Sequence, residues 1–217
     1  MNYGSNEYER KYYGLDIEAA EYNAQRLRHF VKHMGTVWKS LEDKWILDVG
    51  CGNGYWLRQI LELGADPEKV FGIDLTSERF KQGVGKNPRI KLITSDARSL
   101  PFADLVFDLV IQNVCFMTIP LEQDRRQVAT EMSRVLARGG YIYWWDLGQL
   151  GPPYQALGTN QPEHYWSDLP IARNVVGRMP TVSDCLLPGR RRALLGGLID
   201  RLGYKATHVS ALLGPKP

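Results

Sequence analysis

The chain has 217 residues, of which 44% are hydrophobic and 24% are charged, and its net charge is +3. This length fits one domain, and the composition is that of an ordinary globular protein, which excludes disordered and fibrous classes. We expect a cytoplasmic protein, because no apolar run approaches about eighteen residues and the N-terminus lacks the order of a secretory signal. The small basic excess disfavours a nucleic-acid partner.

The first predicted element is an amphipathic helix that ends at Met34. Asp16 is placed as its N-cap, and Gly35 follows its last residue. Its apolar residues recur mostly at spacings of three and four, and they are Leu15, Ala19, Tyr22, Leu27, Phe30, Val31 and Met34. We expect residues 1–40 to form a helical cap that packs on the sheet of a single domain.

Short β-branched segments then alternate with helical patterns across the core, residues 41–147. The predicted strands are 45–49, 70–75, 90–95, 107–114 and 141–146, and the predicted helices are 55–63, 77–84 and 122–136. Such alternation is typical of a doubly wound α/β domain, with a mostly parallel sheet and helices on both faces. We therefore predict a Rossmann-like fold.

The alternation breaks after Leu147. Prolines at positions 152, 153, 162, 170, 180 and 188 disfavour long helices, so we expect 148–178 to be an irregular cover within a substrate-side insertion, 148–190. The C-terminal part, 191–217, is predicted to contain a helix over 191–201 and a last strand over 205–213.

The strongest local signal is the segment 46–57, in which an apolar strand leads into alternating glycines and then a helix. Gly50, Gly52 and Gly54 can adopt positive φ and bring no Cβ toward a ligand, while the helix start offers unpaired N–H groups. We expect this turn, with Asp48 and Cys51, to contact a bound cofactor.

Two acidic residues at the ends of the next strands define the rest of the predicted cofactor site. Asp74 lies twenty residues after Gly54, where a carboxylate can accept both ribose hydroxyls, and Leu75 follows it. Asp96 could accept from the exocyclic amine of adenine, while the N–H of Ala97 donates to the ring. The three motifs together predict an adenosyl site.

With these motifs the chain resembles the class I S-adenosylmethionine-dependent methyltransferases, in their compact methyltransferase-domain subgroup. The resemblance spans about residues 45–146 and rests on the segments 47–54, 72–74, 95–102, 107–110 and 135–140. It implies a seven-stranded sheet with one reversed strand, and S-adenosylmethionine as cofactor, with S-adenosylhomocysteine as product. It also implies that Gln112, Asn113 and Phe116 face the methionine end.

Other residues are weaker candidates for function. Tyr13 belongs to an N-terminal tyrosine cluster that could close over a cationic sulfonium. His164 and Asp146 are the candidate general bases, His164 because imidazole titrates near neutral pH within the expected cover. At least one of Trp144 and Trp145 should fill the core, because neighbouring strand residues face opposite sides. The three cysteines are widely spaced, so no metal site is predicted.

The sequence leaves several classes of methyl acceptor open. We expect methyl transfer to a hydroxyl or amine of a small molecule such as a sugar, lipid or secondary metabolite, by a monomer or homodimer with no membrane span. Methylation of RNA or protein is an alternative, as is a catalytically silent cofactor-binding interaction protein. A dinucleotide oxidoreductase is disfavoured, because its fingerprint requires a glycine where Trp56 or Leu57 stands.

Overall fold

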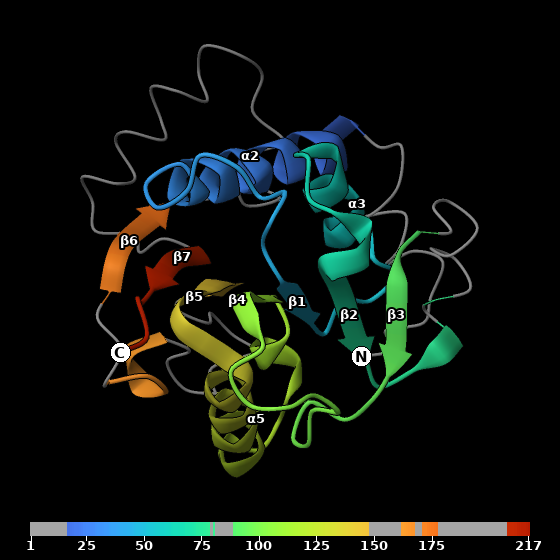
Figure 1. The fold of residues 1–217 in the computed structure, drawn as a ribbon, viewed down its shortest axis with the longest axis vertical. Helices are drawn as coiled ribbons and strands as arrows, with labels where there is room; N and C mark the ends of the chain where they lie inside the picture. The colour runs from blue at the N-terminus through green and yellow to red at the C-terminus, as the bar shows by residue number, and fades with distance from the viewer. Residues whose placement is uncertain (1–16, 79, 81–88, 148–161, 168–170, 178–207) are drawn as a thin grey trace.

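A computed structural model describes residues 17–78, 80, 89–147, 162–167, 171–177 and 208–217 (Figure 1). Tyr13, the N-cap Asp16, the helix expected over 191–201 and most of the helix expected over 77–84 lie outside these residues. No helix in the described part of the chain combines the length and the apolarity needed to cross a membrane.

The described strands form one seven-stranded sheet in the order β3-β2-β1-β4-β5-β7-β6. The strands are β1 (Ile46–Val49), β2 (Val70–Asp74), β3 (Lys91–Thr94), β4 (Phe107–Asn113), β5 (Leu136–Leu147), β6 (Ile171–Gly177) and β7 (His208–Leu213). The pairs β3–β2, β2–β1, β1–β4 and β4–β5 are parallel, whereas β7 is antiparallel to both β5 and β6. From β1 the chain first adds β2 and β3 on one side and then adds β4 and β5 on the other side. In open α/β sheets ligands bind at the carboxyl ends of the strands where the strand order reverses in this way.

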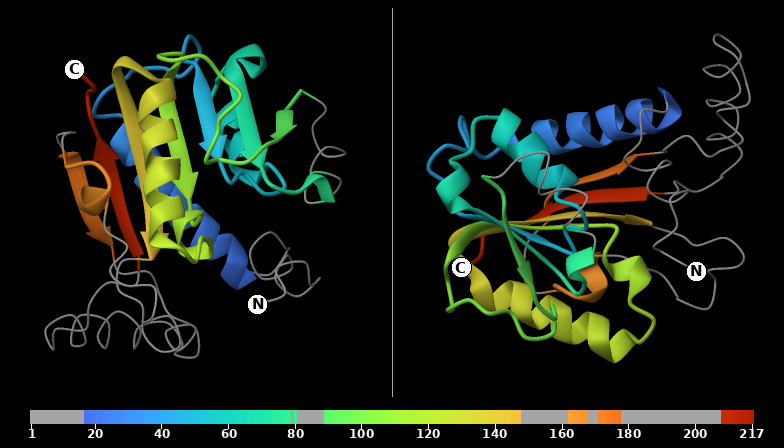
Figure 2. Two further views of the ribbon diagram at one scale, coloured as in Figure 1. Left: turned by 90° about the horizontal axis from the view of Figure 1, so that it is seen from below. Right: turned by 90° about the vertical axis from the view of Figure 1, so that its right-hand side faces the viewer.

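Helices cover both faces of this sheet, as Figures 1 and 2 show. On one face lie α2 (Ile17–Met34) and α3 (Tyr55–Glu62), and on the other lies α5 (Glu122–Val135). All four residues of β1 are buried, because helices cover it from both sides and strands flank it on both edges. The predicted Rossmann-like α/β fold is therefore confirmed.

Trp144 and Trp145 show how the strand alternation divides the core into two layers. Trp144 is fully buried among the residues of the α5 side, and Trp145 is 1% exposed among those of the α2 and α3 side. Both indoles fill the core, as the alternation predicted for at least one of them.

Two elements differ from the sequence-based prediction. Residues 171–177, expected to be irregular, form the edge strand β6; no proline stands between Pro170 and Pro180, so this window was free to pair. Strand β5 begins at Leu136 rather than 141, and its register against β4 shifts between Phe107 and Leu109. This irregularity accommodates Gly139, whose φ of 74° lies in the left-handed region.

Candidate functional site

The turn between β1 and α3 is built by glycines in the left-handed region. Gly50, Gly52 and Gly54 have φ of 74°, 57° and 73°. The N–H groups of Gly50 and Cys51 both donate to the carbonyl of Ile73 at 2.9 Å, which fastens the turn to the end of β2. A Cβ on Gly50 would lie 2.6 Å from Cys115 Sγ, so the site needs glycine there for space as well as for its φ.

Asp74 is tied to the same turn. Its Oδ2 accepts from the Gly52 N–H at 3.0 Å, and its Oδ1 accepts from the Thr76 N–H at 3.3 Å. The residue is only 5% exposed. Asp74 also lines the cavity described next, and a carboxylate there can accept hydrogen bonds from hydroxyl donors.

A cavity of about 400 Å³ opens at the carboxyl ends of β1 to β4. This volume lies within the range of small-molecule and cofactor sites. Seven of the residues predicted to bind cofactor line it, and they are Gly50, Gly52, Asp74, Leu75, Asp96, Ala97 and Asn113. The structure thus brings the three predicted motifs to one cavity.

A buried cation lies at the β4 side of the cavity. Arg26, on the inner face of α2, is 4% exposed and lines the cavity. Its guanidinium donates to Asn23 Oδ1 at 3.0 Å and to Asn113 Oδ1, and it lies 5.0 Å from the centre of the Trp56 ring. Helix α2 therefore delivers a positive charge to the end of the sheet.

Asp48 lies beneath the glycine turn and is 1% exposed, and neither carboxylate oxygen has a hydrogen-bond partner. Burial raises the pKa of this carboxyl from 3.8 to about 7; the charge of Arg26 opposes the rise, and that of Asp74 adds to it. A buried carboxyl without hydrogen bonds is unusual in proteins. Asp48 was predicted to contact the cofactor, but it is not among the described residues that line the cavity.

The β3 side of the cavity holds an ion-paired cluster of Asp96, Arg98 and Asp124. Arg98 donates through Nε to both Asp96 oxygens, at 3.1 and 3.0 Å, through Nη2 to Oδ2 at 2.6 Å, and through its backbone N–H to Oδ1 at 2.9 Å. Its Nη1 reaches Asp124 Oδ1 on α5 at 3.2 Å. These bonds hold the pKa of Asp96 below its usual range.

Comparison with known proteins agrees with this geometry. Residues 47–144 match the family described as "Methyltransferase domain". These residues form a class I S-adenosylmethionine-dependent methyltransferase domain.

Relatives of this methyltransferase domain differ in their named acceptors. The chain is 34% identical over 115 residues to a demethylmenaquinone methyltransferase of Lysinibacillus sphaericus, covering 51% of this chain and 48% of that protein. It is 31% identical over 102 residues to a malonyl-[acyl-carrier protein] O-methyltransferase of Hamiltonella defensa, covering 47% and 37%. The chain thus spans about half or less of these curated relatives.

A solved S-adenosylmethionine-dependent methyltransferase from Methanosarcina mazei has a similar fold. The TM-score is 0.64 at 19% identity, and the match covers 85% of this chain and 97% of that one. At this level of identity the likeness concerns the fold alone.

Several predicted residues support the methyltransferase domain from behind the cavity rather than lining it. Cys51 is buried against Gly72, and Gly54 begins α3. Gln112 is fully buried, and its side chain accepts from the N–H groups of Cys115 at 3.0 Å and Phe116 at 3.5 Å and donates to the Trp145 carbonyl at 3.3 Å.

Phe116 and Gln112 therefore do not face the cavity as the resemblance implied. Phe116 is fully buried, and its ring packs edge-on against Trp144 and Tyr165. The apolar ring is stabilised by these aromatic neighbours, and the amide of Gln112 is used to shape the chain after β4.

The two candidate bases of the methyltransferase domain also lie away from the cavity lining. His164 ends a short 3-10 helix, Pro162–His164, that lies against the outer surface of α5. Its Nε2 lies 3.1 Å from Glu122 Oε1 and 2.9 Å from Arg126 Nη2, both on α5. Glu122 is offset by two residues from the cavity-lining Asp124, which places the two on nearly opposite sides of the helix. Asp146 is fully buried and accepts from the N–H of Met117 at 3.3 Å.

Sequence reasoning missed Arg26, Arg98 and Asp124, all of which line the cavity. A signal existed for Arg26, because it lies four residues before Phe30, on the apolar face of the predicted helix. No comparable pattern marks Arg98 or Asp124, whose meeting depends on how α5 packs beside the loop after β3.

Proposed function

We propose that this chain binds S-adenosylmethionine in the cavity and transfers its methyl group to a hydroxyl or amine of a small molecule. The observation that carries the proposal is that Gly52, Asp74 and Ala97, from three different strand ends, line one cavity. A nucleoside with an amino-acid tail needs such a series of sites along a sheet edge.

The residues present fit this cofactor in charge and hydrogen-bonding capacity. Asp74 is a carboxylate in the cavity lining that can accept from ribose hydroxyls, and Gly50 and Gly52 let the backbone approach closely. Arg26 provides a cation for the carboxylate of the amino-acid part. When bound, the cofactor supplies an electrophilic methyl group on a sulfonium.

The protein's own contribution is alignment and exclusion of water. Val114, Ile119 and Val128 give the cavity an apolar wall beside the polar strand ends. Methyl displacement needs the acceptor in line with the breaking bond, and holding two reactants in that arrangement can supply roughly 7 to 11 kcal/mol of the barrier reduction. We infer that orientation is the main source of catalysis.

A small-molecule acceptor is consistent with the weak net charge of +3 and with the relative named for demethylmenaquinone, whereas the acceptor of the relative named for malonyl-[acyl-carrier protein] is carried on a protein. The aligned residues cover mainly the cofactor half of the site, so the acceptor belongs to the proposal. The oligomeric state that we propose is a monomer or homodimer.

The proposal is tested by incubating the purified chain with methyl-labelled S-adenosylmethionine and a cell extract divided into small-molecule, RNA and protein fractions. We expect label in a small-molecule product. Label in RNA or protein would contradict the acceptor class, and binding of S-adenosylhomocysteine without any transfer would favour a silent cofactor-binding protein.

A further inference from the structure

One wall of the cavity is formed by the chain that follows β4. A short 3-10 helix, η2 (Phe116–Thr118), leads into Ile119 and Pro120. Thr118, Ile119 and Pro120 all line the cavity, and we call these three residues the η2 wall. The residues assigned to the nucleoside stand at the ends of β1, β2 and β3, so the η2 wall is a separate part of the lining.

Arg125 of α5 fixes the exit of the chain from η2. This residue is 6% exposed, and its Nη1 donates to the carbonyls of Ile119 at 2.7 Å and Pro120 at 3.4 Å. Carbonyls inside a protein need a donor, which helices and sheets usually provide. Here one guanidinium serves two consecutive carbonyls, so a single side chain sets the course of the η2 wall.

The same guanidinium binds a second segment, which comes from the chain between β5 and β6. Arg125 Nε donates to the Tyr165 hydroxyl at 2.9 Å. The Tyr165 ring stacks on Trp144, with ring centroids 5.8 Å apart, and meets the Phe116 ring edge-on at 5.1 Å. Tyr165 therefore supports the η2 wall in two ways, through Arg125 and through Phe116.

Residues 162–167 are anchored to α5 beside Tyr165, and Figure 1 shows this short orange segment next to that helix. Trp166 is 1% exposed, and its Nε1 donates to Ser133 Oγ at 2.9 Å and to the Ala129 carbonyl at 3.3 Å. Because its neighbour is buried and hydrogen-bonded, Tyr165 presents its hydroxyl from a fixed position.

The η2 wall borders the place where the proposed methyl transfer occurs. Asn113 and Val114, at the end of β4, line the same cavity, and Asn113 binds Arg26, the cation assigned to the carboxylate of the cofactor's amino-acid part. That part carries the sulfonium and its methyl group. A displacement of about 1 Å near the reacting atoms can reduce a rate by about a hundredfold, so the position of this wall matters for the acceptor.

From these contacts we propose that Arg125 and Tyr165 are positioning residues, which lock the η2 wall to residues 162–167 and so hold the methyl acceptor in line with the cofactor. Both side chains lie outside the cavity lining and act through the wall. The inference rests on the proposed function, because it assigns the acceptor side of the same cavity.

The first test measures hydrogen exchange at the backbone amides of Thr118 and Ile119, which bond to the carbonyls three residues before them. Tyr165→Phe removes the hydroxyl and keeps the ring. Arg125→Lys keeps the charge, but a single terminal nitrogen cannot occupy the positions of both Nε and Nη1. We expect exchange at both amides to become about threefold to tenfold faster in each variant, because each variant breaks the bridge.

Two matched variants serve as controls. Tyr141→Phe removes the hydroxyl of a tyrosine outside the cavity lining, and Arg28→Lys replaces an exposed arginine of α2. Both should leave the exchange rates as in the wild type. Unchanged rates in Tyr165→Phe and Arg125→Lys would overturn the proposal, whatever the methyl acceptor is.

The second test separates alignment from cofactor binding. Transfer from methyl-labelled S-adenosylmethionine is measured over dilutions of the small-molecule fraction of a cell extract, and affinity for S-adenosylhomocysteine is measured by calorimetry. We expect kcat/KM for that fraction to fall by about tenfold in Arg125→Lys and by about threefold in Tyr165→Phe, while the affinity stays within about twofold of the wild type. The double variant should be no worse than Arg125→Lys alone, because both changes break one bridge.

Parallel losses of affinity and transfer would show that the η2 wall serves the cofactor and not the acceptor. Unchanged transfer despite faster exchange would show that the wall does not align the acceptor. Either result overturns the proposal. Absence of S-adenosylhomocysteine binding, or of any transfer, in the wild type would instead overturn the proposed function itself.

Discussion

Gly52 donates its backbone N–H to Asp74 Oδ2 at 3.0 Å, and this bond joins the glycine turn after β1 to the carboxylate at the end of β2. The turn and the acid therefore form one unit. A change in either residue is expected to disturb the other, because the bond is buried and charge-assisted.

In the glycine turn after β1, the space around Gly50 limits substitution as much as its positive φ does. Gly50→Ala places a Cβ 2.6 Å from Cys115 Sγ at φ 74°, whereas Gly139→Ala, also at φ 74°, meets nothing within 4 Å. We expect Gly139→Ala to lower the free energy of unfolding by about 1 kcal/mol and Gly50→Ala by roughly 1 to 3 kcal/mol more. Urea unfolding of both variants measures the difference, and equal losses would show that Cys115 yields without cost.

Asp48 makes the stability depend on pH. Its folded-state pKa of about 7 lies above the unfolded value near 3.8, so folding favours the protonated form. The contribution of Asp48 to the free energy of unfolding is therefore most favourable below pH 3.8, its unfolded pKa, and is lost as the pH rises through its folded pKa of about 7. Asp48→Asn should therefore be more stable than wild type above pH 7, by on the order of 2 to 4 kcal/mol, with the advantage vanishing near pH 4. A difference independent of pH, in denaturant unfolding at pH 4, 6 and 8, would contradict this account.

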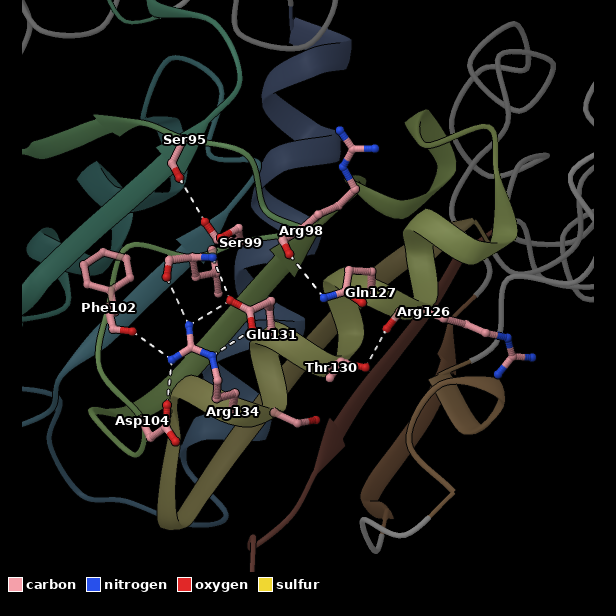
Figure 3. Close-up of polar contacts among 12 residues, drawn as sticks. Ser95, Arg98, Ser99, Phe102, Asp104, Arg126, Gln127, Thr130, Glu131 and Arg134 are labelled. Carbon is pink, nitrogen blue, oxygen red and sulfur yellow. Dashed lines mark hydrogen bonds and ion pairs between the residues drawn. The ribbon is translucent and has the colours of Figure 1, made fainter.

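Arg134 anchors the loop that carries Asp96 and Ala97. Its guanidinium bonds to Glu131, to Asp104 and to two backbone carbonyls, as Figure 3 shows. Arg134→Met should destabilise the fold by about 1 to 3 kcal/mol, because it leaves backbone acceptors unpaired. The control Arg126→Met removes an exposed pair with Glu122 and should cost below about 1 kcal/mol. Similar melting temperatures for the two variants would refute the anchoring role.

Arg26 should affect binding more than any exposed arginine of α2. Arg26→Met removes the buried cation from the cavity, and we expect affinity for S-adenosylhomocysteine to fall by at least about tenfold, with Arg26→Lys intermediate. The exposed Arg28, on the same helix, provides the control Arg28→Met. If both methionine variants bind alike, Arg26 has only a structural role.

The sequence allowed the sheet and the turn to be predicted because both depend on local patterns. The apolar segments 46–49 and 107–113 and the alternating glycines are contiguous, and parallel strand ends necessarily gather at one edge. The Asp96–Arg98–Asp124 cluster could not be predicted, because Asp124 belongs to a helix whose rotation is decided by packing. Gln112 was misassigned because a buried amide after a strand can equally serve a ligand or the chain beside it.

Titration of S-adenosylhomocysteine into the wild type and Asp74→Ala tests the central claim most directly, with Asp43→Ala, an exposed aspartate outside the cavity, as the control. The account predicts one site per chain, and a loss of about tenfold to a hundredfold in Asp74→Ala alone. Undetectable binding by the wild type, or equal affinity in Asp74→Ala, would contradict it.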